Sequence, residues 1–194
     1  ADWHKSGLQG TVRWKTRPLD LVLLRLGADV EIHSGQTKLK STLGYGFGKK
    51  IIIRQLNGQI APDTLKTLVN WQWPANPIQL SETQFNFNQE NGFSQAEGNL
   101  QWGGGELVYT FAERQDRMNM PALNGKLKDE AGKLQFDIQD LRSQKMANIA
   151  FDQNLMLDVQ LTQRLLQNVP SYDGKAGLDT YVISTRQPLL QRGL

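Results

Sequence analysis

The stretch Leu56-Asn57-Gly58-Gln59-Ile60 recurs in related form three more times, and this recurrence decides the fold expected of the chain. Each copy reads apolar-x-Gly-x-apolar; the others are Leu8-Gln9-Gly10-Thr11-Val12, Ala96-Glu97-Gly98-Asn99-Leu100 and Leu123-Asn124-Gly125-Lys126-Leu127. Residues two apart on a strand share a face, so the apolar residues and the Gly of each copy point the same way. A Gly there leaves room for a bulge, a tight bend or a large neighbouring side chain. The unequal spacing of the copies excludes a fixed-period solenoid.

Alternating apolar and polar residues indicate strands along most of the chain. Runs of this kind occupy residues 11–15, 29–32, 38–43, 51–53, 84–88, 99–102, 107–111, 133–139 and 155–159. Such alternation predicts a sheet with one buried and one wet face. Turn residues at 35, 91–92, 103–105 and 130–132 predict hairpins between successive strands. We therefore expect a mainly β protein, with a long curved antiparallel sheet or a partly open β-barrel or sandwich.

Three short helices are predicted between the strands, at residues 18–26, 62–69 and 161–169. The first opens on Pro18 and stops at Gly27, and the third stops before Pro170. Helices of two or three turns are not stable alone in water, so we expect them to lie against the ends or edges of the sheet. We expect a single domain over residues 1–194, which would divide near residue 74 if it consists of two similar halves, 1–74 and 75–194.

Composition narrows the class of protein. The chain has 194 residues, of which 39% are hydrophobic and 21% charged, so it can bury a core. It has no Cys, which excludes disulfides and thiolate metal sites. The net charge of +3 comes from scattered Lys and Arg without a basic run interleaved with aromatic residues, so we expect no nucleic-acid binding. No stretch approaches the roughly 20 apolar residues of a transmembrane helix.

The sequence offers little for catalysis, which needs a positioned His or paired carboxylates. Its two His are His4, near the start, and His33, whose neighbour Ser34 points to the opposite face of a strand. The Gly-rich run 44–50 ends in two Lys like a phosphate loop, but strand residues follow where a helix is required, so we predict a hairpin tip. We expect no enzyme activity, no catalytic residue, no cofactor and no metal site.

The five Trp residues supply the remaining candidates for binding. Trp14 and Trp102 lie in alternating strands, where we expect them to belong to the core. Trp71-Gln72-Trp73-Pro74 follows a predicted helix in a loop, and an exposed Trp pair is typical of a binding hot spot. Trp71 and Trp73 are therefore the candidate partner-binding residues. The alternative, that they cap one end of the sheet, stays open at this point.

Residues 8–19 carry a family resemblance. Their order of Gly10, a strand with Trp14, Arg17-Pro18 and a Leu-rich helix resembles a passage of type II secretion system protein N. The strand at 28–32, the segment 56–62, the copy at 123–127 and a closing strand at 180–185 follow the same order of elements. The resemblance implies a single-pass inner-membrane protein with a periplasmic domain. It also implies work with the machinery that moves folded proteins through an outer-membrane secretin channel.

Two functional expectations follow. The family resemblance implies a non-enzymatic accessory component whose periplasmic domain docks on inner-membrane secretion subunits. The family's membrane helix is absent from this sequence, so we expect the full-length protein to be anchored in the inner membrane through a preceding N-terminal helix. The alternative is a binding protein for lipid or other hydrophobic cargo, because repeated strand units with one apolar face also resemble the groove-like sheets of AsmA-type envelope proteins.

Overall fold

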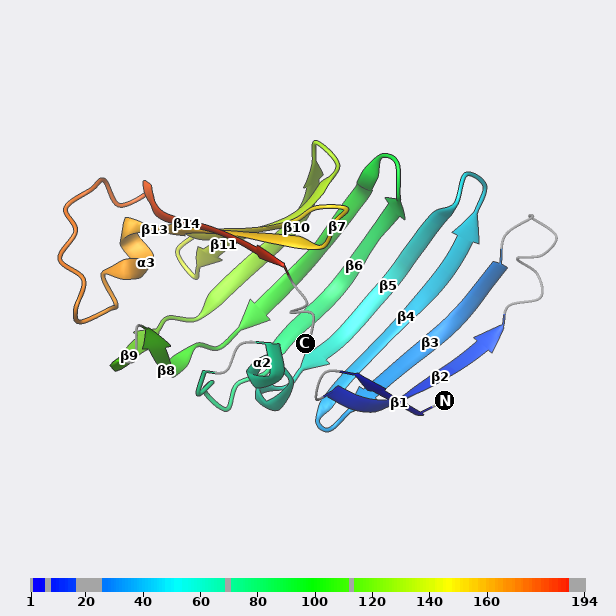
Figure 1. The fold of residues 1–194 in the computed structure, drawn as a ribbon, viewed down its shortest axis with the longest axis horizontal. Coiled ribbons are helices and arrows are strands. Elements are labelled where there is room, and N and C mark those ends of the chain that lie inside the picture. Colours follow the sequence, from blue (N-terminus) through cyan, green and yellow to red (C-terminus); the bar gives the residue numbers. More distant parts are fainter. Residues whose placement is uncertain (1, 6–7, 17–25, 69–70, 112–113, 189–194) are drawn as a thin grey trace.

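An antiparallel sheet of twelve strands dominates the computed structural model of the chain, which describes residues 2–5, 8–16, 26–68, 71–111 and 114–188 (Figure 1). Its strands, in spatial order, are β1 (Asp2–Lys5), β2 (Leu8–Thr16), β3 (Leu26–Ser34), β4 (Thr37–Gly46), β5 (Lys50–Ile60), β6 (Ile78–Asn88), β7 (Gly92–Trp102), β10 (Leu123–Glu130), β11 (Lys133–Asp140), β12 (Lys145–Phe151), β13 (Met156–Thr162) and β14 (Tyr181–Pro188). The sheet stays open, with β1 and β14 at its edges. The predicted long antiparallel sheet is confirmed, in its open form.

Nearly every strand pairs with its neighbour in sequence, as the predicted hairpins require. The exception follows β7, which pairs with β10 instead of the next strand. Between them, β8 (Gly105–Phe111) and β9 (Arg114–Met120) form a separate two-stranded sheet. Two backbone hydrogen bonds between Gln72 and Val108, of 2.9 and 3.1 Å, attach it to the preceding loop. The glycines at 103–105 therefore lead into an excursion, and the prediction of a simple hairpin there is wrong.

Of the three predicted helices, two lie among the described residues. The helix predicted at 62–69 is confirmed as α2 (Pro62–Leu68). The helix predicted at 161–169 is the single turn α3 (Gln163–Leu166), because Thr162 still belongs to β13 and caps α3 by accepting a hydrogen bond from the Leu165 N–H. Most of the helix predicted at 18–26 lies outside the described residues, and Leu26 opens β3. No helix of the described part is long and apolar enough to cross a membrane.

The register gives the whole sheet one apolar and one polar face. A single row of cross-strand partners crosses eleven strands of the sheet and contains only apolar residues and Gly: Val12, Ile32, Leu39, Gly58, Leu80, Leu100, Gly125, Ile138, Ala147, Leu161 and Ile183. Partners in register share a face. All four repeat copies meet in or beside this row, which explains why their apolar and Gly positions recur.

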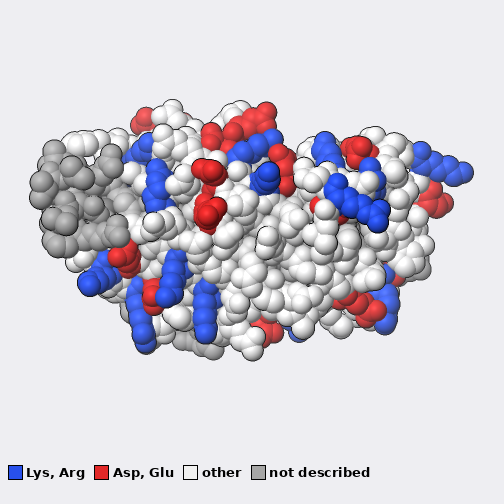
Figure 2. Space-filling view, turned by 180° about the vertical axis from the view of Figure 1, so that it is seen from behind, with Lys and Arg blue, Asp and Glu red and all other residues white. Residues whose placement is uncertain are grey.

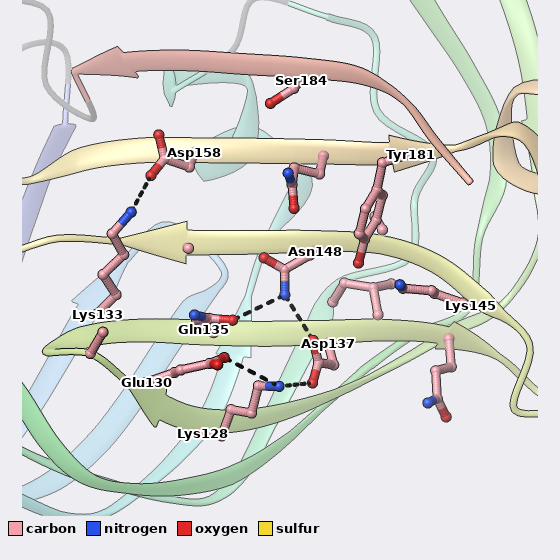
Figure 3. A pocket seen from close by; sticks show the side chains of 16 residues that line it. Lys128, Glu130, Lys133, Gln135, Asp137, Lys145, Asn148, Asp158, Tyr181 and Ser184 are labelled. Atoms are coloured by element: carbon pink, nitrogen blue, oxygen red, sulfur yellow. Dashed lines mark hydrogen bonds and ion pairs between the residues drawn. The ribbon is translucent and has the colours of Figure 1, made fainter. Parts of the chain in front are cut away.

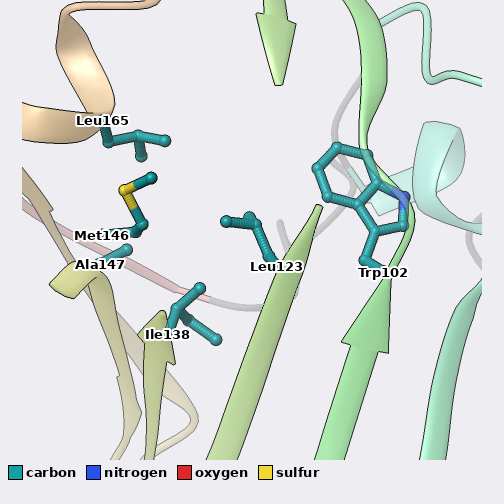
Figure 4. Close-up of a cluster of buried hydrophobic side chains, with 6 residues drawn as sticks. All are labelled: Trp102, Leu123, Ile138, Met146, Ala147 and Leu165. Carbon is teal, nitrogen blue, oxygen red and sulfur yellow. The ribbon is translucent and has the colours of Figure 1, made fainter. Parts of the chain in front are cut away.

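The packed core covers only part of this apolar face. One cluster of buried side chains joins β7, β10, β11, β12 and α3; its members are Trp102, Leu123, Ile138, Met146, Ala147 and Leu165 (Figure 4). A second cluster contains Phe93, Leu127 and Leu134, with the Phe85 and Phe87 rings 5.7 and 4.9 Å from the Phe93 ring. By contrast, none of the described apolar side chains of β2–β5 is fully buried. The core therefore lies over the second half of the sheet.

The repeat glycines stand where neighbouring strands approach most closely. At Gly58, where φ is +141°, a side chain would run into the Lys38 carbonyl oxygen. At Gly125, a Cβ atom would lie 2.8 Å from the Ile138 Cδ1 atom and 3.2 Å from the Leu100 Cβ atom. The pairing of β5 with β6 also shifts register between Leu56 and Gly58. Both reasons that the sequence suggests for Gly, a bulge and a large neighbour, are present.

We expect Gly58→Val and Gly125→Val each to lower the free energy of unfolding by about 1–3 kcal/mol, because each forces atoms into occupied space. Urea denaturation of the purified chain measures this. Gly46→Ala is the matched control, since its only close neighbour is the Ile52 Cδ1 atom at 3.5 Å, an ordinary contact. Midpoints of both Val variants equal to that of the wild type would contradict the close packing described here.

Candidate functional site

The two ends of the sheet are built differently (Figure 1). At one end, besides short turns at 35–36 and 141–144, the strands are joined by α2, the Trp71–Trp73 loop, the β8–β9 hairpin, and the segment with α3 between β13 and β14. At the other end, the described connections are short turns at 47–49, 89–91, 131–132 and 152–155. We call these the covered end and the hairpin end. Among the described residues, the hairpin end therefore carries less structure beyond the strands than the covered end.

The apolar face of β2–β5 lies open to solvent over a wide area. Trp14, Tyr45 and Ile51 are 59%, 48% and 41% exposed. Between them lies a row of half-buried or exposed partners in register, which runs through Thr16, Ala28, Leu43, Ile53 and Phe85. Contiguous exposed apolar surface of this kind usually marks a place where a partner or ligand binds. We call this surface the open apolar face, and it is the first candidate site.

Trp14 does not join the core, so the sequence expectation for it is wrong, whereas Trp102 is buried as expected. The reason is the length of the sheet. The buried clusters draw on β6–β13 and α3, and β2 lies four strands away from β6. Alternation correctly places Trp14 on the apolar face, but alternation says nothing about whether that face is covered.

A hollow of about 850 Å³ lies on the opposite, polar face of β10–β14 (Figure 3). Its charged side chains pair with one another except Lys145, whose Nζ lies 4.1 Å from the centroid of the Tyr181 ring. The Lys128 and Asp137 side chains are 2.7 Å apart, the Asn148 amide donates to Asp137 at 2.7 Å, and Lys133 lies 3.0 Å from Asp158. The hydrogen bond to Asp137 raises the pKa of Lys128. Because these charges already have partners, the hollow offers few free groups to a charged ligand.

Ion pairs also occur elsewhere on the described surface. Seen from behind, basic and acidic side chains lie close together in several places (Figure 2). On β3 and β4, for example, Lys40 lies 3.0 Å from Glu31, and His33 lies 3.7 Å from the same carboxylate. The Lys40 hydrogen bond lowers the pKa of Glu31. Among the described residues, no three His, Cys, Asp or Glu side chains stand close enough to hold a metal ion.

An ion-pair network fastens the edge strand β14 to the sheet. Arg186 of β14 pairs with Asp158 of β13, at 3.0 Å, and with Asp152 in the β12–β13 turn. Asp152 also accepts hydrogen bonds from the Asn154 and Met156 N–H groups, at 2.8 and 3.1 Å. Burial alone raises the pKa of Asp152, but these N–H groups and the Arg186 charge outweigh it and hold the pKa below its ordinary value. Asp152 is therefore a charged anchor at the edge of the sheet.

The structure brings Trp71 and Trp73 together at the covered end. The two rings are stacked with their centroids 6.0 Å apart. The Trp71 ring is tilted against Tyr109 at 5.9 Å, and the Trp73 ring meets Trp102 edge-on at 6.1 Å. Trp73 packs on the buried cluster of Figure 4, so it covers the end of the sheet. Both rings are half-buried, and each retains some surface. Binding of a partner by this pair stays a prediction.

Sequence reasoning missed both the hollow and the Arg186 network. Each depends on β13 pairing with β14, whose partners Asp158 and Arg186 lie 28 residues apart. A long irregular segment separates the two strands, and no local pattern encodes that pairing. One local signal existed, since Asp152-Gln153-Asn154 between two strands is typical of a turn in which the Asp side chain accepts backbone N–H groups.

We expect Asp152→Asn to lower the free energy of unfolding by about 1 kcal/mol at pH 7 through loss of the charged hydrogen bonds. Because the folded-state pKa of Asp152 lies below its ordinary value, its contribution is present above that ordinary value and is lost as the pH falls through the folded-state pKa. The gap between wild type and variant therefore closes in acid. Urea denaturation across the acidic range checks this. Asp173→Asn, at an exposed position, is the control, and a gap independent of pH would contradict the anchor role.

No curated protein and no solved structure matches the chain. The model of one protein family, described as type II secretion system (T2SS), protein N, matches residues 1–168. The match therefore covers the sheet from β1 to β13 together with α3, and leaves β14 outside. With most of its length matched, the chain belongs to the type II secretion system protein N family.

Proposed function

We propose that this chain is a non-enzymatic accessory component of the type II secretion system, located in the periplasm, whose domain docks on inner-membrane subunits. In the full-length protein, an N-terminal helix would anchor it in the inner membrane. The observation that carries the proposal is family membership over residues 1–168. Membership by itself supports a secretion component in the cell envelope, and docking is the further step that we propose.

Two surface features support docking. The sheet ends in edge strands, and an edge strand presents unpaired backbone groups that a partner strand can extend. On β14, the side chains of residues 183–188 are exposed, so a partner strand can approach. At the covered end, Trp71 rests on Trp73 and Tyr109 while keeping part of its surface free, which is the setting of a rigid aromatic anchor. Trp71 and Trp73 are the candidate contact residues.

A pull-down with the chain as bait, from a detergent-solubilised envelope extract, tests docking by mass spectrometry. We expect inner-membrane secretion subunits to be recovered, and we expect Trp71→Ala to reduce their recovery at least about tenfold, as loss of a hot spot does. Leu141→Ser is the matched control, because Leu141 is a 72% exposed apolar residue in the β11–β12 turn at the same end of the sheet. Absence of secretion subunits from the wild-type pull-down would contradict docking.

The open apolar face favours a second candidate function, the binding of lipid or other hydrophobic cargo. The observation behind it is that the apolar side chains of β2–β5 share one face and none of those described is fully buried. A ligand with an apolar chain would remove this surface from water, which is favourable in proportion to the area covered. The hollow on the polar face is lined mainly by charged and polar side chains, so it offers no comparable apolar surface.

Native mass spectrometry of the purified chain tests lipid binding. We expect adducts of lipid mass on the wild type and their loss in Leu43→Asn and Ile53→Asn, each of which places an amide in the middle of the open apolar face. Lys38→Gln, at an exposed position on the polar face of β4, should retain the adducts. If the wild type carries no lipid and takes up no fluorescent fatty acid, this second function is wrong.

A further inference from the structure

The apex of the β4–β5 hairpin exposes its largest side chain. Phe47 is 79% exposed, the most of any large hydrophobic residue that the structure describes. It sits in a three-residue loop closed by the pairing of Gly46 with Lys50, and the loop turns through Gly48 and Lys49, whose φ angles are +74° and +56°. The Asn88 amide of the next hairpin donates a 2.5 Å hydrogen bond to the Gly48 carbonyl oxygen, which ties this apex to its neighbour.

An apolar track runs from this apex back to the core. Directly below Phe47, Tyr45 and Ile51 form a cross-strand pair on the apolar face, and they are 48% and 41% exposed. Ile51 stands opposite Phe87, whose ring lies 4.9 Å from that of the buried Phe93. Phe47 therefore follows directly, in the loop, on a row of apolar residues that leads from the core to the hairpin end of the sheet.

Two lysines, Lys49 and Lys50, follow Phe47 in the hairpin. Lys49 is exposed and Lys50 half-buried, and neither forms an ion pair within the part of the chain that the structure describes. This differs from Lys128 and Lys133 of the polar hollow, which have carboxylate partners. Among the described residues, the neighbouring β6–β7 turn contributes one acidic side chain, Glu90, against the two lysines.

We propose that this hairpin apex docks on the surface of an anionic phospholipid membrane, with Phe47 in the interface and Lys49 and Lys50 against the headgroup phosphates. Aromatic rings prefer the interfacial layer of a bilayer, and Lys side chains extend from it to the headgroups. A three-residue apex is far smaller than the roughly 800 Å² per partner that a stable protein interface needs, so a bilayer surface fits it better than a protein. This inference goes beyond both proposed functions and depends on neither.

Flotation with lipid vesicles tests the proposal on the whole chain. We expect binding to mixed phosphatidylglycerol and phosphatidylcholine vesicles, weakened by salt, and little binding to pure phosphatidylcholine. Removing both charges in Lys49→Gln/Lys50→Gln should weaken binding about 25-fold, roughly fivefold for each lysine. Phe47→Ser should weaken it about tenfold. The controls Leu141→Ser and Lys38→Gln change an exposed apolar residue and an exposed Lys elsewhere, and should bind like the wild type.

A second readout reports directly on insertion. Because the chain has no Cys, Phe47→Cys and Leu141→Cys can each carry a single environment-sensitive NBD label. We expect anionic vesicles to raise the fluorescence of the label at position 47 and to leave that at position 141 unchanged. Equal binding to neutral and anionic vesicles, wild-type binding by the apex variants, or an equal rise at both labels would overturn the proposal. Those results would not change the outcome of the pull-down or of native mass spectrometry, so this proposal can be wrong while the two proposed functions are right.

Discussion

One constraint governs this molecule. Its twelve-stranded antiparallel sheet carries an apolar face across nearly its whole width, and because the sheet does not close, other side chains must bury that face. The row from Val12 to Ile183 crosses eleven strands with only apolar residues and Gly. Burial of apolar side chains is the main contribution to the stability of such a fold, yet the extent of this burial differs along the sheet. Over β6–β13, aromatic side chains and α3 close the core. Over β2–β5 they do not, so the described apolar side chains of these strands stay half-buried or exposed.

Period-two alternation made much of this predictable from sequence. It located most of the strands and their shared faces, and the recurring Gly marked the close approaches now seen at Gly58 and Gly125. Alternation could not predict the features that depend on pairing between residues far apart in the sequence. The β8–β9 excursion looks locally like one more hairpin, and α3 is short because Thr162 extends β13, a consequence of its pairing with β14. Trp14 shows the same limit, since alternation assigns a residue to a face but not to a core.

The candidate sites were less predictable than the fold, for a related reason. Trp71 and Trp73 stand out in the sequence because a single residue separates them in a loop, and their rings are stacked in the structure. Their use in binding cannot be read from that stacking. The Arg186 anchor needs two carboxylates, Asp152 and Asp158, to meet a strand that follows a long irregular segment. The apex at Phe47 has a local signal, a Gly-rich turn with two Lys, but only the three-dimensional structure shows how far the Phe47 side chain is exposed.

The two ends of the sheet differ in structure, so each end presents a different kind of surface. Helices, the aromatic loop and the β8–β9 hairpin gather at the covered end, where rigid side chains such as Trp71 can meet a protein surface (Figure 1). Short turns make up the described connections of the hairpin end, and the row of apolar residues that leads from Phe93 toward Phe47 ends there. If that apex rests on a membrane, the open apolar face begins at the lipid surface and extends toward the covered end, where we propose that protein partners dock. An acyl chain leaving the bilayer would then meet Tyr45 and Ile51 before it reaches Leu43 and Ile53, so a lipid role and a docking role need not compete for the same surface.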